Sequence, residues 1–133
     1  MLNESRKILH VPNLRLAATC VRVPVRVSHS ESVSVEFQDA ISPDEARAAL
    51  ANAAGVTVVD EPGNSLYPMP INSADEDDVF VGRIRGDIAH DTGLSFWLSC
   101  DNLRKGAALN ALQILDETLA RDCLKPSKQA VSG

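Results

Sequence analysis

The chain has 133 residues, 44% of them hydrophobic, and a formal net charge of −5, which together suit one acidic globular domain. The charge argues against a nucleic-acid surface, because phosphate binding needs clustered Lys and Arg. No apolar run approaches the roughly 20 residues of a membrane span, and Met1 does not open a signal peptide. We therefore expect a cytoplasmic protein with no nucleic-acid partner and no membrane contact.

The first third of the chain is predicted to form a helix and two strands. Residues 3–9 suit the last turns of a helix. Residues 14–27 are rich in Val, Leu and Thr and alternate valine with other residues, which is typical of a strand. Residues 32–37 alternate Val and Phe with Ser and Glu, as an antiparallel strand with one solvated face does.

A helix is then predicted to begin at Ser42. Ser42 suits the N-cap, Pro43 the first helical position and Glu45 the partner that closes a capping box. The helix should continue to about residue 54, where Gly55 ends it. Three further strands are expected, separated by a turn and an acidic loop: residues 57–59, 79–85 and 94–100.

The longest helix is predicted over residues 103–123, with Asp101 and Asn102 capping its start. Its apolar stripe follows helical spacing and is interpreted as core packing; the stripe comprises Ala108, Ala111, Leu112, Leu115 and Leu119. The polar residues 125–133 are expected to fray. Because strands outnumber helices, the predicted fold class is α+β, a largely antiparallel mixed sheet with helices packed on one face.

Arg22 and His29 are the candidate functional residues. A guanidinium matches a carboxylate in two-point fashion, and histidine is the side chain whose proton moves near neutral pH. Seven extended residues span about 23 Å, so the chain must bend, at Pro24 and in the polar run 28–30, to bring both groups to one small substrate. The spacing alone fits a solvated arginine and a structural histidine equally well, and names no enzyme.

The cysteines and histidines show no pattern of a metal site or a disulfide framework. Cys20, Cys100 and Cys123 are an odd number at wide spacing, which favours reduced thiols. The three histidines are equally scattered, so we predict no metal site. Cys20, in the middle of the first predicted strand, is interpreted as a small core residue.

Four segments together resemble the C-terminal half of bacterial aspartate-semialdehyde dehydrogenases. In the family's order they are ATCVRVPV from Ala18, HSESVSVEF from His29, YPMPINSADEDDVFVGRIR from Tyr67 and DNLRKGAALNALQIL from Asp101. The resemblance implies that residues 1–133 form the dimerisation and catalytic domain, with a sheet that pairs in a homodimer. It also implies that the N-terminal NADP-binding half is missing, so that Met1 begins a fragment or a mis-called start.

Enzymes of this family reduce L-aspartyl-4-phosphate to L-aspartate 4-semialdehyde with NADPH and release phosphate, in lysine (diaminopimelate pathway), threonine and methionine biosynthesis. A cysteine thiolate forms an acyl thioester, and a histidine is its acid/base partner. By motif position the resemblance makes His29 that histidine, Arg22 the arginine that binds the substrate carboxylate, and Asn102 a contact to the nicotinamide end of NADP. NADP itself is expected to bind mainly to the missing half.

Three departures from the family's pattern limit what the chain does alone. Ser28 stands where the family commonly has glycine, and serine costs about 1 kcal/mol there if the position needs a positive φ. The seven glycines form no GxGxxG fingerprint, and the Asn-Cys-Thr type motif of the nucleophile is absent. The isolated chain is therefore expected to be inactive.

Two other functions stay open. The main alternative is a catalytically silent domain that only dimerises or binds a partner, although such a domain has no physical need for Arg22 and His29. A module that binds a small anion through Arg22, Arg26 and His29 without chemistry is the third class, and ligand titration separates it from catalysis.

Overall fold

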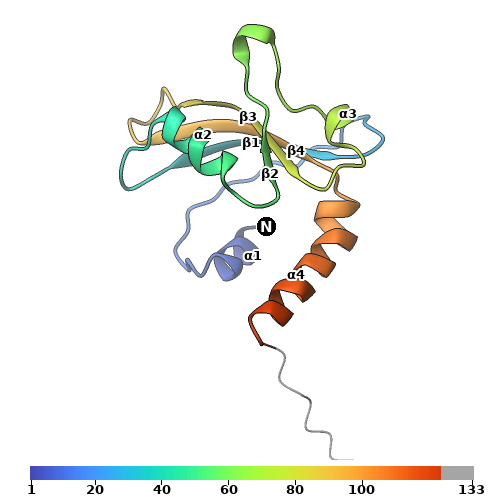
Figure 1. Cartoon of the computed structure of the whole chain (residues 1–133). Coiled ribbons are helices and arrows are strands. Elements are labelled where there is room, and N and C mark those ends of the chain that lie inside the picture. Colours follow the sequence, from blue (N-terminus) through green and yellow to red (C-terminus); the bar gives the residue numbers. More distant parts are fainter. Residues whose placement is uncertain (124–133) are drawn as a thin grey trace, which may run out of the picture.

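Residues 1–123 are described by a computed structural model, in which four strands form one sheet with helices around it (Figure 1). In sheet order the strands are β1 (His29–Glu36), β4 (Gly93–Cys100), β3 (Val79–Gly86) and β2 (Val56–Val58). β1, β4 and β3 pair antiparallel, whereas β2 runs parallel to β3. The predicted α+β class with a largely antiparallel mixed sheet is confirmed.

The helices are short, and they connect or flank the strands. They are α1 (Leu2–Ile8), α2 (Pro43–Ala51), the one-turn α3 (Pro70–Ser73) and α4 (Leu109–Ala120), with a 3-10 turn η1 (Pro62–Asn64) and a π-helical turn η2 (Arg104–Ala108). Within residues 1–123 no helix combines the length and the apolar character that crossing a membrane requires. α2 packs against β2 and β3 and is the main cover of the sheet.

The predicted capping box at the start of α2 is present. Ser42 Oγ accepts a hydrogen bond from the Glu45 backbone N–H, and the Glu45 carboxylate accepts one from the Ser42 N–H. The helix ends at Ala51, three residues earlier than predicted, and Gly55 then turns the chain into β2 with a φ of +72°. Gly55 therefore belongs to the exit loop and not to the last helical turn.

The core lies between α2 and one face of the sheet. Ala46, Val81, Ile84 and Leu94 are buried there and come from α2, β3 and β4. On the other face of β3, Gly82 leaves no room for a side chain. An added Cβ would lie 2.0 Å from the Val59 carbonyl oxygen, so glycine is required where these two backbone segments meet.

A buried ion pair joins α2 to β3. The Asp60 side chain is only 2% exposed and accepts hydrogen bonds from Arg47 Nε at 3.0 Å and Arg47 Nη2 at 2.8 Å. It also accepts from the backbone N–H groups of Arg83 and Ile84, where the register of β3 with β4 shifts. One carboxylate thus satisfies the backbone donors that this β-bulge removes from the ladder.

The prediction of a strand over residues 14–27 is wrong. This segment is irregular, and Val21 and Val23 are 77% and 53% exposed. A strand needs a hydrogen-bonded neighbour, and β1, at the edge of the sheet, pairs only with β4. Cys20 is exposed as well, which corrects its interpretation as a core residue.

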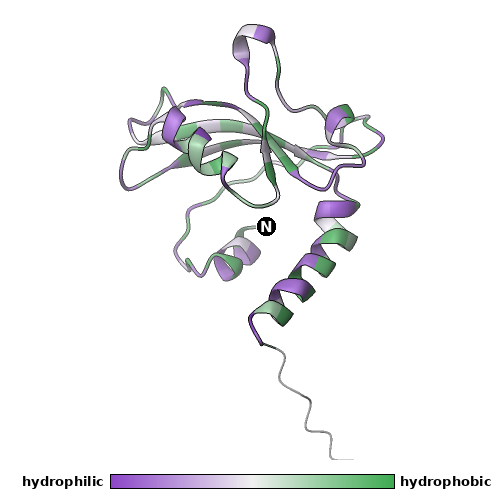
Figure 2. Ribbon diagram, viewed as in Figure 1, coloured by the Kyte–Doolittle hydropathy of each residue, from purple (hydrophilic) through white to green (hydrophobic). Residues whose placement is uncertain are grey.

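The interpretation of the C-terminal stripe as core packing is also wrong. Leu112, Leu115 and Leu119 of α4 are 60%, 46% and 57% exposed, and the helix points away from the sheet (Figures 1 and 2). The helical period is correct, although the predicted helix over 103–123 begins as η2 and becomes regular at Leu109. The predicted fraying of residues 125–133 lies outside the described residues.

Candidate functional site

The candidate site lies where β1 begins and β4 ends. His29, the first residue of β1, pairs with Cys100, the last residue of β4, and its side chain is exposed. Side chains alternate along a strand, so His29 lies on the same face of the sheet as the core residue Leu94, but at the opposite end. The sheet register thereby places the end of β4 beside the predicted base.

The structure brings His29 and Asn102 together through Ser28. The Ser28 backbone N–H donates a hydrogen bond of 2.9 Å to Asn102 Oδ1, one residue before His29 and two residues after Cys100. This bond uses the oxygen of the Asn102 amide. Asn102 is half-buried, and its amide nitrogen donates to no other residue within 1–123.

Asp101 holds the start of the C-terminal helical segment, as its predicted capping role requires. One carboxylate oxygen accepts from the backbone N–H groups of Leu103 and Arg104, and the other accepts from that of Asp75 at 2.9 Å. The hydrogen bond from Asp75, followed by the two from the helix start, lowers the pKa of Asp101 below its usual range. Asn102 therefore does not cap the helix, and its oxygen is directed to Ser28.

Ser28 has the backbone conformation that the family's glycine suggested. Its φ is +85°, in the left-handed region, where a side chain costs about 1–2 kcal/mol. Ser28 is also 4% exposed, and its hydroxyl donates a hydrogen bond of 3.1 Å to the Pro70 carbonyl. Serine is held in this strained conformation by bonds that glycine cannot make.

Arg22 lies on the irregular segment that leads to the site. The chain bends at Pro24, where the Val25 N–H donates to the Val23 carbonyl at 2.9 Å, and bends again at Ser28, whereas Ser30 already belongs to β1. The Arg22 side chain is exposed and makes no hydrogen bond or ion pair to any other part of residues 1–123. Its role beside His29 stays a prediction.

Cys100 is the thiol nearest to His29 along the ladder, and its surroundings do not activate it. Burial raises the pKa of Cys100, and the negative charges of Glu31 and Asp101 raise it further, against a smaller opposite effect of Lys105. A thiol with a raised pKa stays protonated near neutral pH. The surroundings of Cys100 therefore disfavour its thiolate form.

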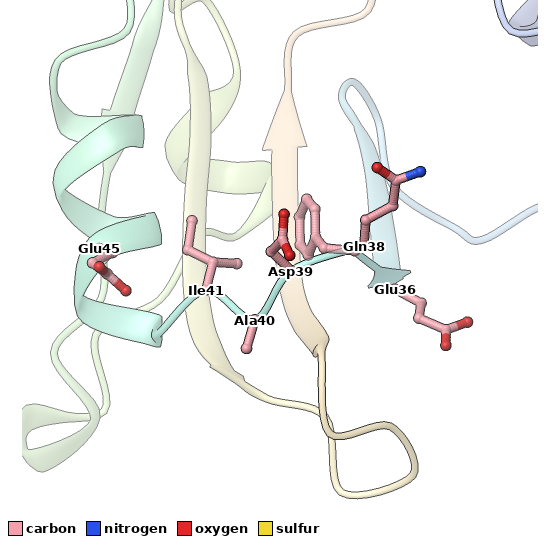
Figure 3. A pocket seen from close by; sticks show the side chains of 7 residues that line it. Glu36, Gln38, Asp39, Ala40, Ile41 and Glu45 are labelled. Carbon is pink, nitrogen blue, oxygen red and sulfur yellow. The ribbon is translucent and has the colours of Figure 1, made fainter.

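A surface hollow lies at the other end of β1. Figure 3 shows it between the end of β1 and the start of α2, lined by residues 36–41 and by Glu45. The hollow is distinct from the candidate site, because it lies at the opposite end of β1 from His29. Several of its lining residues are carboxylates. Among residues 1–123 no group of three or more His, Cys, Asp and Glu side chains is arranged to hold a metal ion.

Sequence reasoning missed the serines behind the site. Ser73 and Ser99 have no exposed surface and share a hydrogen bond of 2.8 Å, and Ser73 Oγ donates to Ser28 Oγ at 3.1 Å. The one available signal is that β4 carries two serines, Ser95 and Ser99, among apolar residues. No local pattern indicates that Ser99 meets Ser73.

The largely antiparallel mixed sheet, with α2 packed on one face and His29 at the start of the edge strand β1, defines an α+β domain. The family model of the semialdehyde dehydrogenase dimerisation domain matches residues 1–105. The chain belongs to the semialdehyde dehydrogenase family, and the part it contains is the dimerisation domain.

Individual relatives agree with this assignment. The chain is 56% identical to the aspartate-semialdehyde dehydrogenase of Aquifex aeolicus over 87% of its own length and 34% of that relative, and 47% identical to that of Bacillus subtilis over the same shares. It therefore spans about a third of the length of the relatives it matches. The resemblance to this enzyme family is confirmed.

Solved structures show the same fold. Aspartate-semialdehyde dehydrogenase II of Vibrio cholerae, complexed with ASA, matches with a TM-score of 0.85 and 38% identity over 93% of this chain and 36% of that one. The Candida albicans aspartate-semialdehyde dehydrogenase, solved with NADP, matches with a TM-score of 0.64 and 26% identity over 77% of this chain and 33% of that one.

Proposed function

We propose that this chain is the catalytic and dimerisation part of an aspartate-semialdehyde dehydrogenase. Such an enzyme reduces L-aspartyl-4-phosphate to L-aspartate 4-semialdehyde with NADPH, in the biosynthesis of lysine, threonine and methionine. The observation that carries the proposal is the hydrogen bond between the Ser28 N–H and Asn102 Oδ1. It joins two segments, distant in sequence, that hold the proposed base and the proposed cofactor contact.

His29 acts as the acid/base group. Its imidazole is exposed at the start of an edge strand, so a thiol from another part of the enzyme can approach it. His29 accepts the proton of that thiol, because a cysteine that is mostly protonated near neutral pH becomes nucleophilic only as the thiolate. The nucleophile itself comes from the part of the enzyme outside this chain.

Arg22 binds the carboxylate of the substrate. Its exposed guanidinium is committed to no partner within residues 1–123, so its donors can form the two parallel bonds that a carboxylate accepts. The bend at Pro24 supports the proposal, because the segment between Arg22 and His29 is not one fully extended strand. Lysine would give a single point of attachment and a poorly oriented substrate.

Asn102 fits one contact to NADP. Its amide nitrogen lies beside the oxygen that Ser28 holds, which suits a hydrogen bond to the carboxamide of the nicotinamide. The chain has no glycine-rich cradle for the phosphates, so the remaining contacts belong to the part outside it. When bound, the cofactor supplies the hydride, and Asn102 helps to orient the ring that carries it.

The proposed enzyme is a cytoplasmic homodimer that contacts neither membrane nor nucleic acid. The match to a dimerisation domain supports the dimer, and the net charge of −5 argues against phosphate-backbone binding. Sedimentation of the purified chain over a range of concentrations measures whether it associates. A mass of two chains is expected, and a monomer at all concentrations would contradict this part of the proposal.

The test of the function joins the chain behind the N-terminal part of the Aquifex aeolicus relative, giving what we call the complemented enzyme. The assay is the NADP- and phosphate-dependent oxidation of aspartate semialdehyde. Activity is expected in the complemented enzyme and not in the chain alone, and His29→Ala should lower kcat about 100-fold or more. A folded, NADP-binding enzyme that is inactive with or without His29 would support the silent-domain alternative.

Arginine variants test the substrate clamp in the same assay. Arg22→Lys should raise KM for aspartate semialdehyde at least about tenfold, because the two-point contact is lost. Arg26→Lys, four residues further along the same exposed segment, is the matched control and should change KM less than about twofold. If both variants raise KM equally, the segment only contributes positive charge, as in the anion-binding alternative.

A further inference from the structure

A continuous row of serine hydroxyls lies behind His29. Ser30 Oγ donates to Ser99 Oγ at 3.0 Å, Ser99 and Ser73 share a bond of 2.8 Å, and Ser73 Oγ donates to Ser28 Oγ at 3.1 Å. The row ends where Ser28 Oγ donates to the Pro70 carbonyl at 3.1 Å. We call these four residues the serine row; they come from β1, β4, α3 and the residue before β1.

The distances allow each hydroxyl in the serine row to donate one hydrogen bond. If Ser99 donates to Ser73, each hydroxyl gives its single proton to the next oxygen, and the last proton reaches the Pro70 carbonyl. Ser28, Ser73 and Ser99 are almost or entirely buried. Ser73 Oγ and Ser99 Oγ also lie 3.4 Å from the carbonyl oxygens of Pro70 and His29, respectively. The shorter bonds of the row satisfy every hydroxyl at once, so the row favours one arrangement of its members.

The row ends at the strained residue next to the proposed base. Ser28 has a φ of +85°, and this conformation sets the direction of the peptide that leads into His29. Two anchors hold it: the hydroxyl bond to Pro70 and the N–H bond to Asn102. Glycine could adopt the same φ without strain, but it would keep only the second anchor.

We infer that the serine row is a positioning device for His29, with Ser28 as its terminal positioning residue. The inference rests on the proposed role of His29. The hydroxyl bonds tie the residue before His29 to α3 and to the end of β4, and so set the backbone position from which the imidazole extends. None of the serines touches the reacting atoms, and their effect on the reaction passes through the orientation of His29.

The first test measures amide hydrogen exchange in the chain itself. Ser73→Ala removes the hydroxyl that donates to Ser28 Oγ and leaves only the Pro70 carbonyl as a partner. It should speed exchange of the Ser28 N–H at least about tenfold, whereas amides of β3 should keep their rates. Ser32→Ala is the matched control, because Ser32 lies on β1 with an exposed side chain that bonds to nothing else in residues 1–123. Unchanged exchange at Ser28 in Ser73→Ala would overturn the inference.

The second test measures kcat and KM in the complemented enzyme. Ser28→Gly relieves the strain but removes the hydroxyl anchor, so kcat should fall about tenfold with KM changed less than about twofold. Ser73→Ala should give a similar loss, and the double variant should be no worse than either single one, because both break the same row. Ser32→Ala should leave kcat unchanged.

The outcomes separate this inference from the proposed function. If His29→Ala abolishes activity while Ser28→Gly and Ser73→Ala keep full kcat at equal melting temperature, the positioning role is refuted and the base stands. If His29→Ala keeps activity, the proposed base is refuted, and this inference falls with it whatever the exchange rates show. If kcat of Ser28→Gly falls only at temperatures where the variant is partly unfolded, the loss reflects stability, and the positioning role is also refuted.

Discussion

The sheet with α2 and the two terminal segments differ in how much of their apolar surface the chain covers itself. In the sheet, Val81, Ile84 and Leu94 are at most 5% exposed, and the Asp60 carboxylate is fully paired. In the terminal segments, Val21 of the N-terminal run and Leu112 of α4 are 77% and 60% exposed. The sheet is therefore specified by contacts within residues 1–123, whereas hydrophobic side chains in the terminal segments lack such contacts.

The candidate site lies at the border between these two regions. His29 and Asn102 are fixed by the sheet and by Ser28, but Arg22 lies on the uncovered N-terminal segment. The proposed base therefore lies on the part of the chain that covers its own core, whereas the proposed substrate clamp lies on an exposed segment.

Gly82→Ala should cause the largest loss of stability. The added Cβ would lie 2.0 Å from the Val59 carbonyl oxygen and 2.7 Å from Pro68 Cδ, so backbone must move. We expect a loss of about 4 kcal/mol or more in the free energy of unfolding, measured by urea denaturation. Gly86→Ala on the same strand meets no atom within 4 Å, and it should change stability by less than about 1 kcal/mol; equal effects would contradict the packing described.

Leu94→Ala and Leu112→Ala compare one substitution in the two regions. Leu94 is 2% exposed, and its truncation leaves a cavity that should cost about 3 kcal/mol. Leu112 is 60% exposed on a helix that tolerates alanine well, so its truncation should change the free energy of unfolding by less than about 0.5 kcal/mol. Thermal unfolding of both variants in parallel checks this, and a similar loss for both would mean that α4 packs against the sheet.

Asp60→Asn should weaken the link between α2 and β3. The amide that replaces one carboxylate oxygen brings a donor against the donors of Arg47 or of the bulge, and we expect a loss of about 2 kcal/mol by guanidinium denaturation. The paired Arg47 has its pKa raised chiefly by Asp60. Asp44→Asn is the control, because Asp44 contacts the same arginine from a 95% exposed position and should matter by less than about 0.5 kcal/mol.

Asp101→Asn should show the smallest effect and a distinct pH dependence. The pKa of Asp101 is lowered in the folded chain, first by the Asp75 N–H, so the carboxylate stabilises the fold at pH values above the ordinary aspartate pKa. That contribution is lost as the pH falls through the lowered value. The melting temperature of the variant should therefore lie a few degrees below that of the parent at pH 7 and approach it as the pH falls below the ordinary aspartate pKa and through the lowered one. A constant difference over this range would contradict the role of the charge.

The elements that the sequence predicts correctly have local causes. The capping box of Ser42 and Glu45 starts α2, and the alternation of residues 32–37 marks a real strand. The run 14–27 has the same alternation and is irregular, because pairing depends on a neighbour that no local pattern reveals. The stripe of α4 likewise predicts the helical period but not what covers it.

The candidate site likewise has residues that the sequence predicts and contacts that it does not. Motif position singles out His29, Arg22 and Asn102, and the φ of Ser28 follows from glycine being common at that position in the family. The contacts of Ser28 with Ser73 and Asn102 join residues 45 and 74 positions apart. Such contacts arise only when the strands pair, so the sequence offers no spacing from which to derive them.

Chemical rescue tests the central claim, that His29 moves the proton, most directly. Imidazole is added to the His29→Ala form of the complemented enzyme, with Asn102→Ala as the control variant. Added imidazole should restore part of the lost kcat in His29→Ala in proportion to its concentration, and none in Asn102→Ala. Absence of rescue in a folded, NADP-binding His29→Ala enzyme, or equal rescue of both variants, would contradict it.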